Sequence, residues 1–460
     1  MKGKNVLILF GVFVVLLALI YFFDVQGTKK REERQEYEKL LFKVEKDSVV
    51  EYTLKNEKDT LTCRKVDGKW NIVSPFFAEG DSKTIESNLN SILGRKIERK
   101  VVDKLTDLEP YGLHKPRGEV IVTCRDSSTI RLFVGSENPT GLYVFVKYPD
   151  KPDIYTTGKS LWNYVNKSVY DLRDKKIMHV DKDKVKKIEL TSKAYGRVVL
   201  EKEGEDWYIR EPIEYRARNS TVKTFLNSLT GNRAKEFVEE DPKSLKKYGL
   251  DNPSVRVDCY VGDELARATL FIGDSIPDKK GRFYGKEESR KPVFTIERYI
   301  VRNLRKNAFY FQEKKISGYD GENADSIVSV VEGEKFVCKK VSDGEWKIIW
   351  PDTMEVEKSR INNWLNGIRD FIVDNLVTYK PKGFKKYGLD KPQVKIEIYN
   401  NGEKVGALLV GKKEDDRYYV RNKKYPFVYK AREYKVKRIM KKIDDLKKKE
   451  KGESSKAKDS

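Results

Sequence analysis

Three tryptophans divide this chain into three copies of one pattern. They lie in the short runs "WNIVSP", "WYIREP" and "WKIIWP", as Trp70, Trp207 and Trp346. In each copy the tyrosine of a Tyr-Gly-Leu motif follows 41 positions later, as Tyr111, Tyr248 and Tyr387. Successive tryptophans are 137 and 139 positions apart, which is longer than a solenoid repeat. The spacing therefore predicts three whole domains in tandem.

The interval between the tryptophan and the tyrosine predicts one amphipathic helix. In the second copy, Val222, Leu226 and Leu229 are separated by four and three positions, which places them on one helix face. The first and third copies carry aliphatic residues at the matching positions. One asparagine of this helix recurs in all copies, as Asn90, Asn227 and Asn366. It either bonds a neighbouring turn or strand, or lies on the solvent face.

The Tyr-Gly-Leu motif predicts a joint between a helix and a strand. Its glycines are Gly112, Gly249 and Gly388. In "LKKYGLDNP" the lysines fit the last turn of a helix, Gly249 fits a left-handed cap, and Leu250 supplies the closing contact. The alternative is a surface patch of tyrosine and aspartate, repeated for avidity. His114 replaces the aspartate in the first copy and disfavours that alternative.

Runs such as "SVRVDCYVG" and "ATLFIG" alternate apolar and polar residues and predict antiparallel strands around each helix. The expected fold class is α+β, with an N-terminal transmembrane helix followed by three tandem antiparallel-sheet-plus-helix repeats. The expected segments are a signal-anchor helix over 1–23, a charged juxtamembrane stalk over 24–43, repeats over 44–178, 179–316 and 317–446, and a disordered polar tail over 447–460.

The run over residues 5–23, "NVLILFGVFVVLLALIYFF", carries no charge before Asp24. Nineteen helical residues span about 28 Å, close to the hydrocarbon thickness of a bilayer. The run is longer than the apolar core of most cleaved signals, and no small-residue cleavage site follows it. We therefore expect a single-pass protein of the cell membrane with its bulk outside the cytoplasm. The alternative is a signal peptide that is removed.

Composition and motifs argue against familiar catalytic chemistry. The two histidines, His114 and His179, lie in different copies, and the four cysteines form no Cys-x-x-Cys pair. Nucleotide-binding, hydrolase and zinc motifs do not occur. We assign no catalytic, cofactor-binding or metal-binding residue and predict that the protein is not an enzyme.

The formal net charge of +22 favours anionic partners such as lipid headgroups, envelope polymers or nucleic acid. The lysines are spread along the chain, so an evenly charged solvated surface explains the same number. Nucleic acid is not expected for a membrane-anchored, exported protein.

The apolar N-terminal run, the repeated W-x-I-x-x-P, the Y-G-L-D-x-P joint and the x-F-x-I-G run together resemble a bacterial family called domain of unknown function 4340, over nearly all of residues 1–446. Members of that family are commonly encoded beside ABC-type transporter components of the gliding-motility type. The resemblance implies an accessory role in the cell envelope, with an ABC-type permease or ATPase as partner. It brings no catalytic residue.

The favoured function is therefore that of a non-enzymatic, single-span membrane-anchored accessory or scaffold protein that works with an ABC-type transport complex. The alternative is a protein that binds an envelope polyanion or lipid. An enzyme with an unrecognised site is disfavoured.

Overall fold

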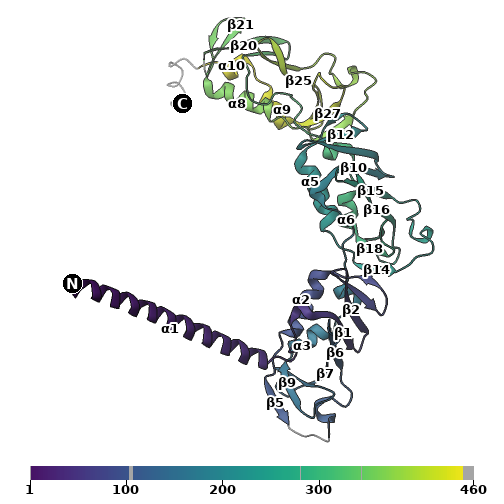
Figure 1. Ribbon diagram of the computed structural model, residues 1–460. Helices are drawn as coiled ribbons and strands as arrows, with labels where there is room; N and C mark the ends of the chain where they lie inside the picture. The colour runs from purple at the N-terminus through teal and green to yellow at the C-terminus, as the bar shows by residue number, and fades with distance from the viewer. Residues whose placement is uncertain (1, 103–106, 280, 343, 449–460) are drawn as a thin grey trace, which may run out of the picture. The chain divides into compact units, whose positions relative to one another are not determined.

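Three nine-stranded antiparallel sheets, each covered by helices on one face, follow a long N-terminal helix (Figure 1). The predicted α+β class with three tandem repeats is thereby confirmed. The computed structural model describes residues 2–102, 107–279, 281–342 and 344–448. Within these ranges the side chains of residues 2, 4–8, 18–19, 22–27 and 102 are not described.

The three sheets have the same strand order. In repeat 1 it is β4-β3-β2-β1-β6-β7-β8-β9-β5, and the strands of repeats 2 and 3 follow the same path. The elements of repeat 1 are β1 (Val49–Asn56), β2 (Thr60–Val66), β3 (Lys69–Ser74), β4 (Ala78–Glu79), α2 (Ser82–Leu93), β5 (Arg99–Val102), η2 (Glu109–Tyr111), β6 (Gly118–Cys124), β7 (Thr129–Glu137), β8 (Tyr143–Lys147), β9 (Ile154–Gly158), α3 (Ser160–Val165) and α4 (Val169–Leu172).

The elements of repeat 2 are β10 (Val185–Ser192), β11 (Gly196–Glu203), β12 (Asp206–Glu211), β13 (Tyr215–Arg216), α5 (Asn219–Gly231), β14 (Glu236–Glu239), η4 (Lys246–Tyr248), β15 (Val255–Val261), β16 (Ala266–Ser275), β17 (Arg282–Glu287), β18 (Val293–Glu297), α6 (Arg298–Leu304) and α7 (Ala308–Phe311). Those of repeat 3 are β19 (Ser326–Val331), β20 (Glu334–Ser342), β21 (Glu345–Trp350), β22 (Met354–Glu355), α8 (Lys358–Arg369), β23 (Asn375–Thr378), η5 (Lys385–Tyr387), β24 (Val394–Asn400), β25 (Glu403–Glu414), β26 (Arg417–Arg421), β27 (Val428–Arg432), α9 (Glu433–Ile439) and α10 (Ile443–Leu446). Short 3₁₀ turns precede β1 and β10, as η1 (Lys46–Ser48) and η3 (Lys182–Lys184).

Alternating side chains explain why each sheet has a covered and an open face. Along β10, Ile188 and Leu190 are fully buried, while Lys187 and Glu189 point to the other side. The buried set packs against the apolar stripe of the helix, where Val222 and its neighbours lie in the same hydrophobic core. The predicted amphipathic helix is therefore confirmed. Burial of such a side chain contributes about 1.5–3 kcal/mol.

The Tyr-Gly-Leu motif corrects one expectation. It does not end the long helix, because α5 ends at Gly231 and the chain then forms β14, which pairs with β18 at the sheet edge. The motif instead forms the short 3₁₀ turn η4. Its glycine has the predicted left-handed conformation, with φ of 63° at Gly249. The helix-to-strand joint is thus a separate turn placed after the edge strand.

The chain forms two compact units, Met1–Lys176 and Ile177–Ser460. Repeat 1 belongs to the first unit. Repeats 2 and 3 form the second unit and share one hydrophobic core. Between them Gln312 donates a hydrogen bond to the hydroxyl of Tyr429 and accepts one from the hydroxyl of Tyr379 at 3.0 Å. The rings of Tyr215 and Tyr425 lie 4.7 Å apart.

The N-terminal helix α1 runs from Lys2 to Glu38 and includes most of the predicted stalk. Among the helices as far as the structure describes them, none has both the length and the apolar character needed to cross a membrane. The predicted anchor over 5–23 falls on α1, and its residues 5–8, 18–19 and 22–23 lie outside the described side chains. From residue 449 on, the predicted polar tail lies outside the described residues.

Candidate functional site

The three repeated tryptophans are core residues. Trp70, Trp207 and Trp346 are all buried. The backbone N–H of Trp207 donates to Oδ1 of Asn219 at 3.0 Å, which ties β12 to the first turn of α5. In repeat 1 the N–H of Trp70 donates to Oγ of Ser82 at 3.2 Å in the same way. The tryptophans therefore hold the strand, the helix and the core together.

The Tyr-Gly-Leu joints pack on the face of each sheet that points away from the main core, and they cover part of that face. In repeat 2, Tyr248 and Leu250 pack with Val293 in a small cluster separate from the main core. The ring of Tyr248 lies 4.9 Å from that of Tyr284. Tyr387 and Tyr111 occupy matching clusters in repeats 3 and 1, and Gly112 and Gly388 share the left-handed conformation of Gly249.

The repeated asparagines lie on the helix surfaces. Asn90 and Asn366 are exposed, and Oδ1 of Asn227 accepts a hydrogen bond from Nζ of Lys182 at 2.7 Å. The repeated positions thus occupy the core, the helix surface and the joint. They do not form one site.

A polar groove lies between α8 and the corner that joins α9 to α10, and we call it the α8 groove. It has a volume of about 530 Å³. Its lining is Arg360, Asn363, Trp364, Asn366, Arg438, Lys441, Asp445 and Leu446. The indole N–H of Trp364 donates to the carbonyl of Ile439 at 2.7 Å and fixes the floor. In the described part of the chain, no carboxylate pairs with Arg438 or Lys441.

Repeat 1 carries a groove at the matching place, between α2 and the corner that joins α3 to α4. This α2 groove has a volume of about 400 Å³. Its lining is Lys83, Thr84, Ser87, Asn88, Ser91, Tyr164, Lys167, Asp171 and Leu172. The amide of Asn88 donates to the carbonyl of Tyr164 at 3.3 Å, while its Oδ1 is buried without a partner among the residues described.

Aromatic side chains stand at these places in repeat 2. Phe225 takes the position of Asn88, and its ring lies 5.3 Å from that of Phe311. Nζ of Lys306 lies 4.5 Å from the ring of Tyr310. Burial of this amine lowers the pKa of Lys306. Lys306 corresponds to Lys167 in repeat 1 and Lys441 in repeat 3. A lysine therefore occurs between the last two helices of every repeat, whereas the other residues that line the groove differ between repeats.

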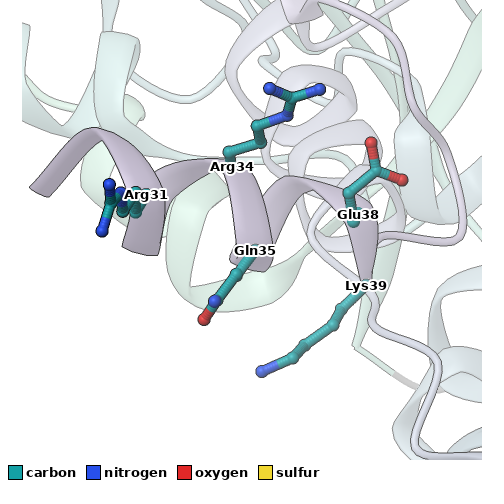
Figure 2. Close-up of a pocket in the computed structure, with 5 residues that line it drawn as sticks. All are labelled: Arg31, Arg34, Gln35, Glu38 and Lys39. Carbon is teal, nitrogen blue, oxygen red and sulfur yellow. The ribbon is translucent and has the colours of Figure 1, made fainter. Parts of the chain in front are cut away.

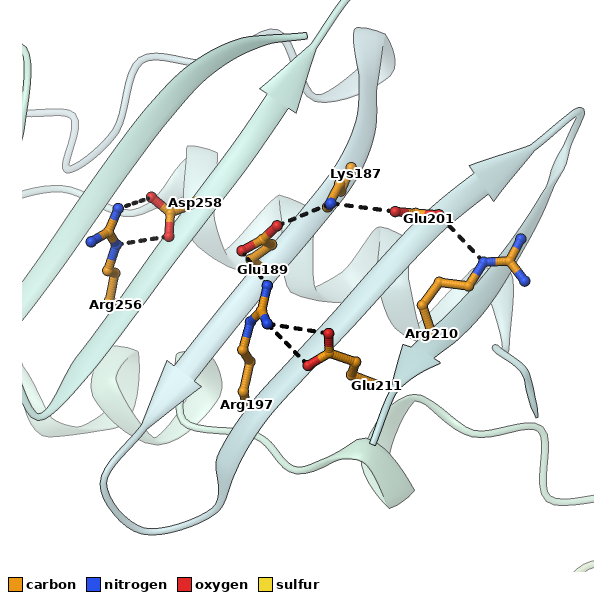
Figure 3. A network of polar contacts seen from close by, with 8 residues as sticks. All are labelled: Lys187, Glu189, Arg197, Glu201, Arg210, Glu211, Arg256 and Asp258. Carbon is orange, nitrogen blue, oxygen red and sulfur yellow. Dashed lines mark hydrogen bonds and ion pairs between the residues drawn. The ribbon is translucent and has the colours of Figure 1, made fainter. Parts of the chain in front are cut away.

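On the open face of repeat 2, charged side chains form a network of ion pairs with one another (Figure 3). Arg197 bridges Glu189 at 2.9 Å and Glu211 at 3.1 Å. Lys187 lies 3.0 Å from Glu189 and 3.4 Å from Glu201. Burial raises the pKa of Glu189, but hydrogen bonds from Lys187 and Arg197 outweigh it and lower the pKa overall.

A hollow beside the last turns of α1 is lined by residues of that helix and by Lys39, which follows it directly (Figure 2). Its lining is Arg31, Arg34, Gln35, Glu38 and Lys39. Neighbouring side chains of one helix diverge from its axis, as Figure 2 shows for Arg34 and Gln35, and they do not enclose a ligand. We assign no site there.

All four cysteines are buried thiols. Burial raises the pKa of Cys63, Cys259 and Cys338 to about 12. Over the described ranges, no group of three or more His, Cys, Asp or Glu side chains is arranged to hold a metal ion. The linings of the two grooves contain hydroxyls, amides, amines and carboxylates, but neither histidine nor cysteine. These groups can recognise a polar or anionic ligand through hydrogen bonds and charge.

Of the groove residues, only Asn366, in the α8 groove, was among the positions selected from the sequence. Identity between copies selected the tryptophans, asparagines and joints, whereas most groove residues differ from one copy to the next. One signal was present: Lys167, Lys306 and Lys441 align when the helices after the last strand are superimposed in sequence.

The fold and surfaces define a tandem-repeat protein in which one α+β domain occurs three times with differing grooves and sheet faces. The chain belongs to the family described as Domain of unknown function (DUF4340), whose model matches residues 70–208, 207–371 and 346–451. The first two matches begin at one repeated tryptophan and end at or beyond the next, so they cross from one sheet into the following one. No curated protein matches the chain.

Proposed function

We propose that this protein is a non-enzymatic, membrane-anchored scaffold of the cell envelope that binds components of an ABC-type transport complex through its repeats. One observation supports the anchoring: among its described side chains, α1 exposes large apolar residues at positions 9–10, 12–17 and 20–21. Leu9 is 76% exposed and Phe13 57%. A helix with so much apolar surface is stabilised by lipid, because burying that surface removes it from water.

The connection between α1 and repeat 1 supports the same proposal. Leu40 forms a β-bridge with Lys96, and the N–H of Leu41 donates to the carbonyl of Arg95 at 2.8 Å. The hydroxyl of Tyr148 also donates to the carbonyl of Leu41. The helix therefore continues directly into a folded domain, and an anchor in α1 would hold repeat 1 close to the membrane.

The anchor is tested by extracting membranes from cells that make the full chain with alkaline carbonate. We expect the wild-type chain to stay in the pellet and a Val12→Asp, Leu16→Asp variant to be released. Arg31→Asp, Arg34→Asp is the control, because it places the same two aspartates in α1 outside the apolar run. Release of the wild-type chain would contradict the anchor. Protease digestion of cells with the outer layers removed tests whether the bulk of the chain lies outside the cytoplasm.

The partner is tested by co-purification from native membranes in mild detergent, followed by mass spectrometry. Recovery of an ABC-type permease or ATPase in a fixed ratio is the expected result. Recovery of only lipid or wall material would favour the second candidate, an envelope polyanion-binding protein. The unpaired cations of the α8 groove, Arg438 and Lys441, favour that candidate, which predicts binding that weakens steeply with salt.

A further inference from the structure

The open face of repeat 3 differs from that of repeat 2 at matching positions. Strand pairing fixes the correspondence. Lys187 pairs with Glu201 on β11, and Ser326 pairs with Lys339 on β20. Glu189 pairs with Val199, and at the same place Val328 pairs with Val337. Because the sheets share strand order and register, each outward-facing residue of repeat 2 has a counterpart in repeat 3.

Three of the four carboxylates drawn in Figure 3 are lost in repeat 3, and the fourth, Asp258, is matched by Glu397. Val328 stands in place of Glu189, Lys339 in place of Glu201, and Trp350 in place of Glu211. The last correspondence follows from the pairing of Val199 with Glu211 and of Val337 with Trp350. Ile349 replaces Arg210, and Lys335 replaces Arg197. On β19, β20 and β21 the ion-pair network of repeat 2 is thus replaced by cations and apolar groups.

These replacements create a surface that we call the lysine–tryptophan face, made of Lys335, Val337, Lys339, Lys347, Ile349 and Trp350. Trp350 is 56% exposed and Ile349 43%. No carboxylate in the described portion of the chain pairs with the three lysines.

The neighbouring carboxylates of the sheet have other partners. Glu355 on β22 stands opposite Lys347 but lies 3.1 Å from Nζ of Lys448. Glu345 accepts a hydrogen bond from the hydroxyl of Ser342 at 2.8 Å. Glu397 on β24 lies 2.7 Å from Lys395, 2.6 Å from Lys404 and 3.3 Å from Lys423. Glu397 therefore does not pair with the lysines of this face. Among the described residues, the lysine–tryptophan face thus combines three lysines that form no ion pair with exposed apolar side chains.

The charge and composition of this face indicate which kind of partner it can bind. A second copy of the same face would be repelled by its like charge. Protein interfaces are depleted in lysine, whereas lysines attract anionic headgroups and tryptophan favours the membrane interface. We propose that the lysine–tryptophan face of repeat 3 binds the headgroup layer of an anionic phospholipid membrane. This inference rests on the proposed function in one respect, that the chain works at a membrane.

The test uses the full chain with one added cysteine that carries a polarity-sensitive fluorophore. Labelling is selective because the four native cysteines are buried. Ser342→Cys places the label at the end of β20, and Glu203→Cys places it at the matching end of β11 in repeat 2. The chains are added to vesicles of phosphatidylcholine alone and of equal parts phosphatidylcholine and phosphatidylglycerol.

We expect a blue shift at position 342 with the mixed vesicles, reversed by high salt and absent with phosphatidylcholine alone. The label at position 203 should not respond. Lys335→Glu, Lys339→Glu, Lys347→Glu should weaken the response about a hundredfold in lipid concentration, because three attractions become repulsions. The matched control Lys223→Glu, Lys243→Glu, Lys246→Glu makes the same charge change at exposed lysines of repeat 2 and should leave the response unchanged.

Equal responses to both vesicles, or a response that survives the triple lysine change, would overturn the proposal. A shift at position 342 with soluble polyglutamate but not with mixed vesicles would also overturn it and assign an acidic protein instead. Co-sedimentation with phosphatidylcholine vesicles reports anchoring by α1 separately. Failure of the anchor and failure of the lysine–tryptophan face therefore give different results.

Discussion

The buried carboxylate of Glu287 binds His179 twice, through the backbone N–H at 2.6 Å and through Nδ1 at 2.7 Å. Glu287 is 1% exposed and ends β17, while His179 leads into β10. Repeat 3 uses Asn422 at the matching place, which donates to the carbonyl of Ser317 at 3.1 Å. Each of these side chains holds the leading segment of its repeat against the last hairpin.

Replacing Glu287 should therefore loosen the start of repeat 2. We expect Glu287→Ala to lower the free energy of unfolding of the second unit by about 2–4 kcal/mol, because it removes a buried carboxylate that accepts two hydrogen bonds from His179. Urea denaturation followed by circular dichroism measures this. Glu288→Ala removes an exposed carboxylate that contacts Arg267 and should change stability by less than about 0.5 kcal/mol. Equal effects of the two changes would contradict the role of Glu287.

Gly273 lies directly under the Tyr-Gly-Leu joint of repeat 2. A Cβ at this position would come 2.0 Å from the carbonyl oxygen of Tyr248. We expect Gly273→Ala to lower the free energy of unfolding by about 2–4 kcal/mol, because the joint must move off the strand. In the control Gly231→Ala, the added methyl meets nothing within 4 Å, so stability should stay the same or rise slightly. A tolerated Gly273→Ala would show that the joint is not held at this distance.

Gln312 couples repeats 2 and 3 through Tyr429 and Tyr379. Burial raises the pKa of both phenols, so they remain neutral hydroxyls that need partners. Because repeats 2 and 3 share one core, we expect the wild-type second unit to unfold in one transition. Gln312→Ala should lower the free energy of unfolding by about 1–3 kcal/mol and separate that transition into two. Scanning calorimetry of the full chain measures the number of transitions. Gln35→Ala, on α1, should leave that transition unchanged, and a single transition in Gln312→Ala would refute the coupling.

Glu397 gives a prediction about pH. Burial raises its pKa, but hydrogen bonds from Lys395 and Lys404 outweigh that effect and lower the pKa to about 2, below the ordinary 4.5. The native state therefore holds fewer protons than the unfolded state, and the stabilisation is complete above the ordinary value and lost as the pH falls toward 2.

We therefore expect Glu397→Gln to cost about 1–2 kcal/mol at neutral pH, after allowance for solvent around the lysines. The difference from wild type should shrink between the ordinary pKa and the folded value. Urea denaturation at a series of pH values measures it, with the exposed Glu403→Gln as control. A difference that does not change with pH would contradict the assignment.

The sequence by itself determined the threefold repeat, the covered faces of the strands and the helical stripe. These features depend on the local spacing of apolar residues. Ile188 and Leu190 alternate with polar neighbours, as in a strand with one buried face, and Val222, Leu226 and Leu229 recur at helical spacing. The left-handed glycine of each joint was predictable for the same reason, because its conformation depends on residues next to it.

Only the tertiary structure decided where the joints and the functional surfaces lie. Strand order places β14 at the sheet edge before the joint forms, and no local pattern encodes that order. The lysine–tryptophan face unites β20 and β21 through their register, and the α8 groove unites residues that are far apart in sequence, such as Arg360 and Lys441. Long-range pairing brings such side chains together, whereas the periodicity of a single segment reports only which of its own residues are buried.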